Sequence, residues 1–150
     1  ATFGPTERQL GGGGTGPVRR VNYHHPESDG NLGEVLALNI PSGEVKWRYR
    51  TRAPFNTAAL TTAGGLVFIG DWNRTMSALD AENGKLLWQV RLATSNQGFP
   101  ISYSVDGKQY IAMPVGTGGA SWSGSLPREL TPELSRPRNG SSMNIFALPD

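Results

Sequence analysis

Two stretches of the sequence, GEVLALNIPSGEVKWRY at residues 33–49 and RTMSALDAENGKLLWQV at residues 74–90, carry the same pattern. Corresponding residues lie 41 positions apart throughout: Ala37 and Ala78, Leu38 and Leu79, Gly43 and Gly84, Trp47 and Trp88. A third, partial copy of the pattern, Ala-Leu-Pro at 147–149, lies 69 positions after the Ala-Leu-Asp of the second copy. A repeat of about 40 residues with about four short strands is typical of a β-propeller blade.

Each copy combines a turn and a tryptophan in a fixed order. The first strand ends in Asn39 or Asp80, whose side chain can accept hydrogen bonds from the backbone N–H groups that follow. The glycine four residues later supplies the positive φ that closes a short hairpin. The tryptophan lies on the next strand, where we expect its ring to dock against the neighbouring blade. An ordinary core position in a β-sandwich is the alternative for both tryptophans.

The rest of the chain follows an all-β pattern. Short runs of β-branched, aromatic and aliphatic residues predict strands at 34–39, 45–50, 57–62, 65–70, 75–80, 86–91, 99–104, 109–114 and 142–148. They form a half-blade at 34–50, a full blade at 57–91 and a three-stranded remainder at 99–148, so that 33–150 contains the last blades of a β-propeller. We expect an irregular N-terminal arm at 1–32 and an insertion loop at about 115–140, with at most a turn of helix at 126–134.

These blades are too few to close a ring, because propellers have roughly four to eight blades. The last unit also lacks its fourth strand and its tryptophan, and an unpaired blade edge promotes aggregation. We therefore expect other polypeptide, a companion chain or a missing N-terminal part, to complete both the ring and the last blade.

Composition narrows the function classes. The absence of Cys excludes disulfides, thiolate zinc sites and cysteine nucleophiles. The net charge is only +2, so we expect no nucleic-acid partner. The longest apolar run, at 66–69, is far shorter than the roughly 20 residues of a membrane helix, so we expect no membrane span. The first residues show no signal-peptide pattern, so an exported protein would carry its signal on other sequence.

Three groups of polar side chains are candidate sites. The neighbouring His24 and His25 would point to opposite faces of a strand, which favours a solvated loop over a metal site. Alternating cations at 46, 48, 50 and 52 favour a basic strand that discourages edge pairing over a nucleic-acid surface. Asp71 and Trp72 follow a strand, where they either line a pocket or start a turn.

Two loop segments lie where propellers carry their function, on the connections at one end of the ring. Residues 53–57 lead into a blade and include Phe55, and residues 116–122 open the insertion and include Trp122. A glycine-rich backbone permits close approach of a flat ligand, and an aromatic ring offers stacking. Loop structure without a ligand is the alternative for both segments.

Three strings are more specific than a generic propeller: LTTAGGLVFIGDWNRTMSALDAENGKLLWQ (60–89), GFPISYSVDGKQYIAMPVGTGG (98–119) and NGSSMNIFALPD (139–150). Over roughly residues 30–150, the chain resembles the C-terminal part of the pyrroloquinoline-quinone (PQQ)-dependent, or quinoprotein, alcohol dehydrogenases. The resemblance implies an eight-bladed, tryptophan-docked propeller in the bacterial periplasm that uses PQQ with Ca²⁺ or a lanthanide. It implies oxidation of alcohols or aldehydes by hydride transfer to PQQ, with a carboxylate taking the alcohol proton and cytochrome c or another acceptor taking the electrons.

The resemblance also implies where the chain would contact the cofactor. The family's metal ligands and catalytic base lie upstream, so we expect no catalytic or metal-binding residue on this chain, which alone would be inactive. Its C-terminal section would supply part of the PQQ pocket wall. The family's tryptophan in the loop that leads into the blade falls here at Asn56, beside Phe55. The family's glycine-rich segment is matched by Gly116, Gly118, Gly119 and Ala120.

Two other functions stay open on the sequence alone. A non-catalytic propeller scaffold for protein binding would share the repeat but would need neither the GFPISYSVDGKQY string nor PQQ. A carbohydrate-binding β-domain would use exposed Trp72 and Trp122 as sugar platforms.

Overall fold

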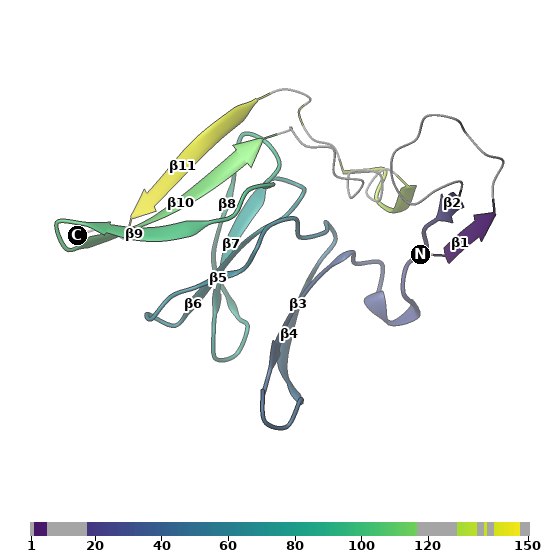
Figure 1. The fold of residues 1–150 in the computed structure, drawn as a ribbon, viewed down its shortest axis with the longest axis horizontal. Helices are drawn as coiled ribbons and strands as arrows, with labels where there is room; N and C mark the ends of the chain where they lie inside the picture. The colour runs from purple at the N-terminus through teal and green to yellow at the C-terminus, as the bar shows by residue number, and fades with distance from the viewer. Residues whose placement is uncertain (1, 6–17, 117–128, 135–136, 138–139, 148–150) are drawn as a thin grey trace.

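The computed structural model describes residues 2–5, 18–116, 129–134, 137 and 140–147, and they form an all-β structure (Figure 1). A two-stranded sheet consists of β3 (Gly33–Leu38) and β4 (Val45–Thr51). The next sheet contains, in order, β5 (Leu60–Thr61), β6 (Leu66–Gly70), β7 (Thr75–Asp80) and β8 (Leu86–Arg91). The third contains β9 (Ile101–Val105), β10 (Lys108–Gly116) and β11 (Ser141–Ala147), with β10 in the middle.

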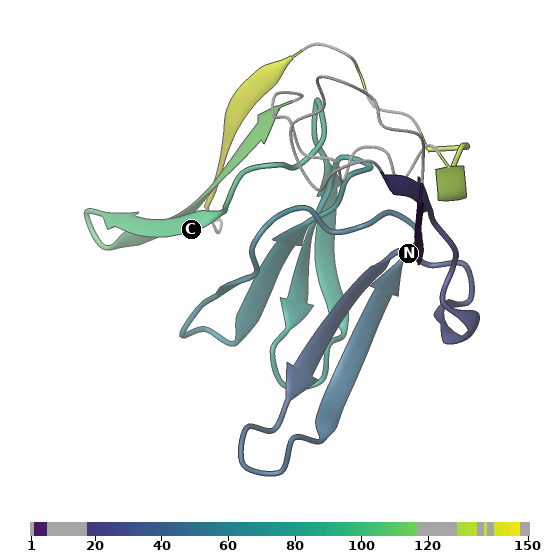
Figure 2. The ribbon, with the colours of Figure 1, turned by 45° about the vertical axis from the view of Figure 1, so that its right-hand side comes forward.

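These sheets are three successive blades, which we number blade 1 (β3–β4), blade 2 (β5–β8) and blade 3 (β9–β11). All paired strands within them are antiparallel. Figure 2 shows the three sheets side by side, spread like the sectors of a fan. The half-blade, full blade and three-stranded remainder predicted from the sequence are therefore present. Assignment of 1–32 as an arm and of 115–140 as an insertion stays a prediction.

The elements differ from the prediction in two places. Strand β5 is limited to two residues instead of 57–62, because the Thr57 hydroxyl, rather than a strand backbone, accepts the Gly70 N–H at 2.9 Å. Ahead of blade 1, the stretch predicted to be irregular contains paired strands β1 (Thr2–Pro5) and β2 (Val18–Val21) and the 3-10 turn η1 (Pro26–Ser28). Strands of four residues are too short to leave a clear period in the sequence.

Blade 2 buries apolar side chains on both of its faces. Trp47, Val67 and Leu79 are buried between blades 1 and 2. The core between blades 2 and 3 contains Phe68, Met76, Ala78, Leu92, Ile111, Met113 and Val115. Successive residues of a strand point to opposite faces. A strand buried on both faces therefore reads as a continuous apolar run, as β6 does with LVFIG.

The repeated turn has the predicted conformation in both copies. Gly43 and Gly84 have φ values of 73° and 74°, in the left-handed region that favours glycine. The side chains of Asn39 and Asp80 accept backbone N–H groups within their turns, at 3.2 and 2.7 Å. The prediction of an Asn- or Asp-initiated, glycine-closed hairpin is confirmed.

Trp47 docks blade 1 onto the repeated turn of blade 2. Its Nε1–H donates to the Ala81 carbonyl at 3.0 Å, and its ring covers Gly84. Trp47 is 9% exposed, whereas its equivalent Trp88 is 39% exposed and makes an edge contact with Phe146, with ring centroids 5.3 Å apart. The docking prediction is confirmed for Trp47, and blade 3 gives Trp88 a less complete contact.

Candidate functional site at the inter-blade end

Connections between antiparallel neighbours alternate between the two ends of each blade. The segments 52–59, 71–74 and 92–100 lie at one end, which we call the inter-blade end, because the first and third of them link successive blades (Figure 2). Gly116 lies there too, since β10 ends at it. The predicted site residues Phe55, Asn56 and Gly116 are thus at one end of the fold. Gly118, Gly119 and Ala120 lie outside the described residues.

The backbone of the loop at 53–57 is fastened to blade 2. The Trp72 N–H donates to the Pro54 carbonyl at 2.9 Å, and the Asn56 N–H donates to the Gly70 carbonyl at 3.4 Å. The Thr57 hydroxyl also bonds Gly70, as described above. These bonds place the half-buried Asn56 beside the end of β6.

Phe55 packs the loop at 53–57 against blade 1. Its ring centroid lies 6.2 Å from that of Tyr49, and its Cδ2 atom lies 3.1 Å from the position that a Cβ on Gly33 would occupy. The same Cβ would collide with the Ala53 carbonyl. The loop can therefore approach β3 this closely only because residue 33 has no side chain. Part of the Phe55 surface stays exposed.

Asn96 joins blades 2 and 3 at the inter-blade end. Its side chain is fully buried, and its Nδ2 donates to the carbonyls of Thr75 and Asp71, at 2.8 and 3.2 Å. It also packs on Gly70, where a Cβ would lie 2.5 Å from the Asn96 Cβ. Sequence reasoning missed this residue, because an asparagine in the run TSNQG carries the same signal as an ordinary turn.

Asp71 and Trp72 are buried, with 7% and 4% of their surfaces exposed. Asp71 Oδ1 accepts the Thr75 N–H at 2.8 Å, so Asp71 starts a turn, as one of its two predicted roles required. Burial raises the pKa of the Asp71 carboxyl to about 6. A buried Trp72 contradicts the hypothesis of an exposed sugar platform at this position. Trp122, the other platform of that hypothesis, lies outside the described residues.

Phe99 is an exposed aromatic residue that sequence reasoning also passed over. It lies on the loop that leads into blade 3, and 69% of its surface is exposed. On the same loop, the Ser95 carbonyl accepts the Gly116 N–H at 3.1 Å. Counted from the first residues of β5 and β9, Phe99 takes the position of Ala58, so the repeat gave no signal for an aromatic side chain there.

The basic strand β4 is neutralised locally. Glu34 pairs with Arg50 at 2.5 Å and with Arg48 at 3.2 Å, and the bond from Arg50 lowers the pKa of the Glu34 carboxyl. His24 donates from Nε2 to the Leu130 carbonyl at 3.2 Å.

Among the described residues, His, Asp and Glu side chains do not form groups of three or more that could hold a metal ion. Nor does this part of the chain contain a helix long and apolar enough to cross a membrane.

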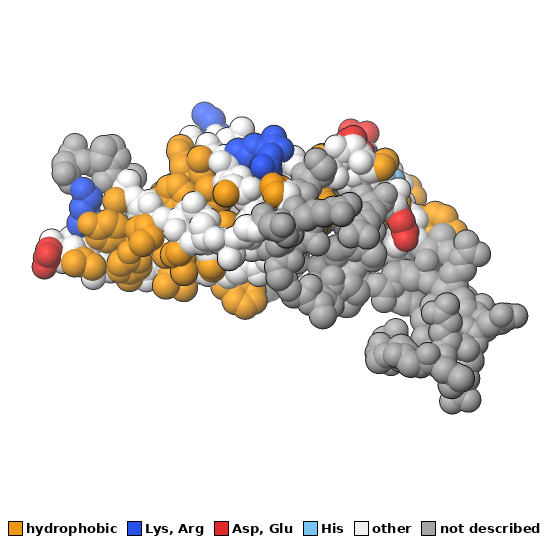
Figure 3. All heavy atoms as spheres, turned by 90° about the horizontal axis from the view of Figure 1, so that it is seen from above, with side chains coloured by type: hydrophobic (Ala, Val, Ile, Leu, Met, Phe, Trp, Pro, Cys, Tyr) orange, Lys and Arg blue, Asp and Glu red, His pale blue; other side chains and the backbone are white. Residues whose placement is uncertain are grey.

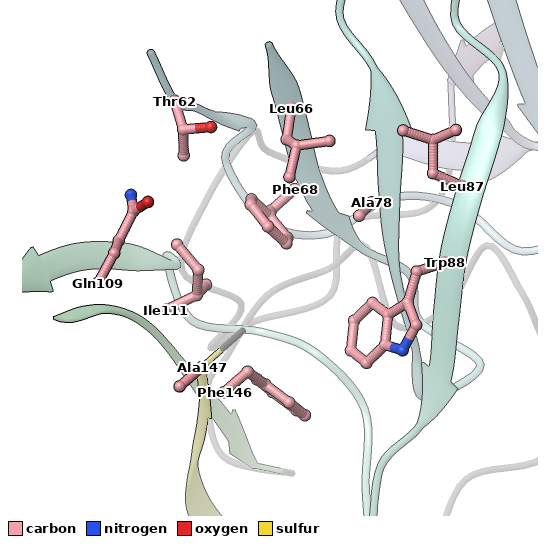
Figure 4. A pocket seen from close by; sticks show the side chains of 10 residues that line it. All are labelled: Thr62, Leu66, Phe68, Ala78, Leu87, Trp88, Gln109, Ile111, Phe146 and Ala147. Atoms are coloured by element: carbon pink, nitrogen blue, oxygen red, sulfur yellow. The ribbon is translucent and has the colours of Figure 1, made fainter. Parts of the chain in front are cut away.

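An apolar pocket of about 380 Å³ lies at the seam between blades 2 and 3 (Figure 4). Trp88 and Phe146 form one side of it, and Leu66, Phe68 and Ile111 line the rest. The corresponding seam between blades 1 and 2 is filled by Trp47 and the turn at 81–84. Trp88 thus borders an open pocket, whereas its equivalent Trp47 packs on a turn of the next blade.

Successive antiparallel blades joined by a docked tryptophan define this chain as part of a β-propeller. A family model described as "PQQ: Glucose/ethanol/alcohol dehydrogenase, beta-propeller domain" matches residues 32–111. The chain belongs to this family of PQQ-dependent dehydrogenase propellers.

Two curated relatives that match most of this chain are dehydrogenases. The quinoprotein ethanol dehydrogenase of Pseudomonas aeruginosa is 36% identical over 124 residues, which are 81% of this chain and 19% of that protein. The 1-butanol dehydrogenase (quinone) of Thauera butanivorans is 37% identical over 123 residues, again 81% and 19%. The chain thus spans about a fifth of the length of these relatives.

Solved structures show the same relationship. A europium-containing methanol dehydrogenase superposes with a TM-score of 0.69 at 27% identity, over 83% of this chain and 24% of that one. The quinohemoprotein alcohol dehydrogenase from Comamonas testosteroni superposes with a TM-score of 0.54 at 34% identity, over 57% and 13%. The all-β propeller fold and the resemblance to PQQ-dependent alcohol dehydrogenases are confirmed.

Proposed function

We propose that this chain contributes propeller blades and part of the cofactor pocket wall to a PQQ-dependent dehydrogenase that oxidises alcohols or aldehydes. The match of residues 32–111 to the PQQ dehydrogenase propeller carries this proposal. Two relatives that match most of the chain are named for ethanol and 1-butanol oxidation, which favours primary alcohols as substrates. A non-catalytic scaffold is not favoured, because the matched relatives are oxidoreductases.

The inter-blade end has the chemistry that a planar quinone needs. Asn56 offers an amide, Phe99 an exposed aromatic face and Gly116 a backbone without a side chain, all at this end. PQQ, when bound, supplies the carbonyl that accepts the hydride. The residues of this chain hold the ring and exclude water from it, and Phe55, Gly118, Gly119 and Ala120 belong to the same proposed wall.

The other parts of the machinery belong to other polypeptide in this proposal. We place the Ca²⁺ or lanthanide ion, its ligands and the carboxylate base there, as the resemblance to the family implies. The similarity to a europium-containing methanol dehydrogenase supports a lanthanide rather than Ca²⁺ as one option for this ion. Several relatives are cytochrome c-linked by name, which supports a cytochrome c as electron acceptor. Redox partners of that kind favour a periplasmic location.

Neighbouring blades cover the open faces of this chain. Gly43 is the equivalent of Gly84, yet a Cβ on Gly43 would meet nothing within 4 Å, and Ile40 in the same turn is 94% exposed. A tryptophan of a preceding blade fits there as Trp47 fits on Gly84. Figure 3 shows hydrophobic side chains gathered on blade 3, at the left, and the exposed ones there are Ile101, Tyr103, Val105, Met143 and Ile145. A following blade would bury them.

The direct test is PQQ-dependent turnover by the full-length protein that contains this chain. The purified apoprotein would be loaded with PQQ and either Ca²⁺ or a lanthanide, and alcohol-dependent reduction of an artificial dye would be followed. We expect oxidation of ethanol or 1-butanol that requires both PQQ and the metal ion, with cytochrome c able to replace the dye. Loaded protein that oxidises neither primary alcohols nor aldehydes would contradict the proposal.

A further inference from the structure

Arg52 occupies the junction between blade 1 and the loop that carries Phe55 and Asn56. Strand β4 ends at Thr51, and the residue after Arg52, Ala53, is 3% exposed. The Thr51 hydroxyl donates to the Ala53 carbonyl at 2.7 Å, so the chain turns sharply here. The direction in which the loop at 53–57 leaves β4 is therefore determined at Arg52 and its two neighbours.

The guanidinium of Arg52 bonds two chain segments far from it in sequence. Its Nε donates to Glu133 Oε1 at 2.6 Å, and its Nη2 donates to the Leu130 carbonyl at 3.0 Å. Its Nη1 donates to the Gly30 carbonyl. A guanidinium presents five donors in a rigid planar fork, so one side chain can satisfy three acceptors at once. Arg52 thus ties the segments 28–33 and 129–134 to the end of β4.

Other side chains hold the same turn at 129–134. Asn22, 8% exposed, donates from Nδ2 to Glu129 Oε2 at 2.6 Å. The bond from His24 gives the Leu130 carbonyl its second donor. Thr131 is fully buried within this contact. The turn is consequently a fixed anchor for Arg52 and not a solvated loop that adapts to it.

Arg48, on strand β4, shows what an ordinary cation close to Arg52 in sequence does. Its side chain is 42% exposed, against 41% for Arg52, and its ion-pair partner is Glu34 on the adjacent strand of the same blade. Exposed ion pairs of this kind contribute little to stability. The difference at Arg52 lies in its two additional bonds to backbone carbonyls of separate segments.

We propose that Arg52 is a positioning residue for the loop at 53–57, and thereby for the part of the cofactor wall that contains Asn56. The loop is held at its far side by Gly70 and Trp72 of blade 2, and Arg52 holds its near side. The link to the cofactor rests on the proposed function. The fixing of the loop itself does not.

Two measurements on the full-length protein test separately whether Arg52 fixes the loop and whether the loop supports the cofactor wall. Hydrogen exchange of the Asn56 and Trp72 amides, whose bonds close the loop onto blade 2, reports the loop without any cofactor. The rate of PQQ loss from loaded protein, followed by quinone absorbance after dilution, reports the wall. Both would be compared in Arg52→Gln, Arg52→Lys and the control Arg48→Gln.

We expect Arg52→Gln to speed exchange of both amides at least about tenfold and PQQ loss by a similar factor, while Arg48→Gln changes neither. Arg52→Lys, which keeps the charge opposite Glu133 but loses the fork, would fall between them. Equal exchange in Arg52→Gln and Arg48→Gln would overturn the proposal. Faster exchange with an unchanged rate of PQQ loss would overturn the link to the wall. If the wild-type protein took up no PQQ, the proposed function would fail, and amide exchange would still decide whether Arg52 positions the loop.

Discussion

The indole of Trp47 lies on Gly84 so closely that a Cβ at residue 84 would come within 2.6 Å of its Cε3 atom. The Nε1–H of the same ring donates to the Ala81 carbonyl. A single tryptophan thus fixes the angle between two blades through the bare backbone of the next repeat. The angle between blades in turn positions the loops at the inter-blade end.

This contact predicts a large effect of Gly84→Ala. The new methyl group meets Trp47, and an L-residue must adopt φ of 74°, so we expect a loss of about 2–4 kcal/mol in the free energy of unfolding. Gly43→Ala has the same φ cost but no ring above it in this chain. Denaturant unfolding of the full-length protein would compare them.

The comparison also tests the proposed neighbouring blade. If a preceding blade docks a tryptophan on Gly43, both substitutions cost the same in the full-length protein. A cost of only about 1 kcal/mol for Gly43→Ala, the backbone contribution alone, would argue against that blade.

Asn96→Ala is expected to weaken the joint between blades 2 and 3. The substitution removes two buried hydrogen bonds and opens a space above Gly70, which together cost about 2–4 kcal/mol. Asn144→Ala is the matched control, because its amide makes only a 3.5 Å bond to the Met113 carbonyl besides a contact with exposed Ser142. Calorimetric unfolding of the two variants would measure the difference, and equal melting temperatures would refute the role of Asn96.

Gly33→Ala should displace the loop at 53–57. Its Cβ would collide with the Ala53 carbonyl and press on Phe55, and overpacking of this kind costs about 1–3 kcal/mol. We expect lower stability together with weaker PQQ binding, measured by titration of the apoprotein. Gly64→Ala is the control, since its Cβ would come no closer than 3.9 Å to the Thr62 hydroxyl. The same PQQ affinity in both variants would show that Gly33 does not support the wall.

Asp71 predicts a pH dependence of stability. Its pKa in the folded protein is raised to about 6 from 3.8, so the folded state binds a proton that the unfolded state has already lost. The stabilising effect of this proton is complete below about pH 4 and is lost as the pH rises through about 6. Asp71→Asn keeps an oxygen for the Thr75 N–H and removes the charge.

We therefore expect Asp71→Asn to be more stable than the wild type at pH 7, by about 1–3 kcal/mol, and equal to it near pH 4. Unfolding curves at pH 4, 5, 6 and 7 would show the gap opening. A gap that is constant with pH would mean that the Asp71 carboxyl titrates normally in the folded protein.

The fold could be predicted because the sequence repeats. Parts of the candidate site could not, because they depend on contacts between residues far apart in the chain. The 41-residue offset between Trp47 and Trp88 predicted blades, turns and docking, because the same local physics recurs in each copy. The exposure of Trp88 and the burial of Trp72 were not predictable, since each depends on what packs against the residue from elsewhere in the chain.

The same distinction holds for the polar contacts. Asn96 and Arg52 act through backbone carbonyls of distant segments, and such acceptors leave no trace in residue type or spacing. In the sequence, Arg52 looks like one more cation in the alternating series at 46, 48, 50 and 52. In the structure it bonds two separate segments, whereas Arg48 pairs with a carboxylate of its own blade.

The central claim is that this chain forms part of a PQQ-holding propeller, and native mass spectrometry of the full-length protein tests it most directly. The apoprotein would be incubated with PQQ and Ca²⁺ or a lanthanide, weighed intact and then weighed again after denaturation. We predict a mass increase of one PQQ and one metal ion per propeller, lost on denaturation. An intact mass that stays that of the apoprotein at saturating PQQ would contradict the account.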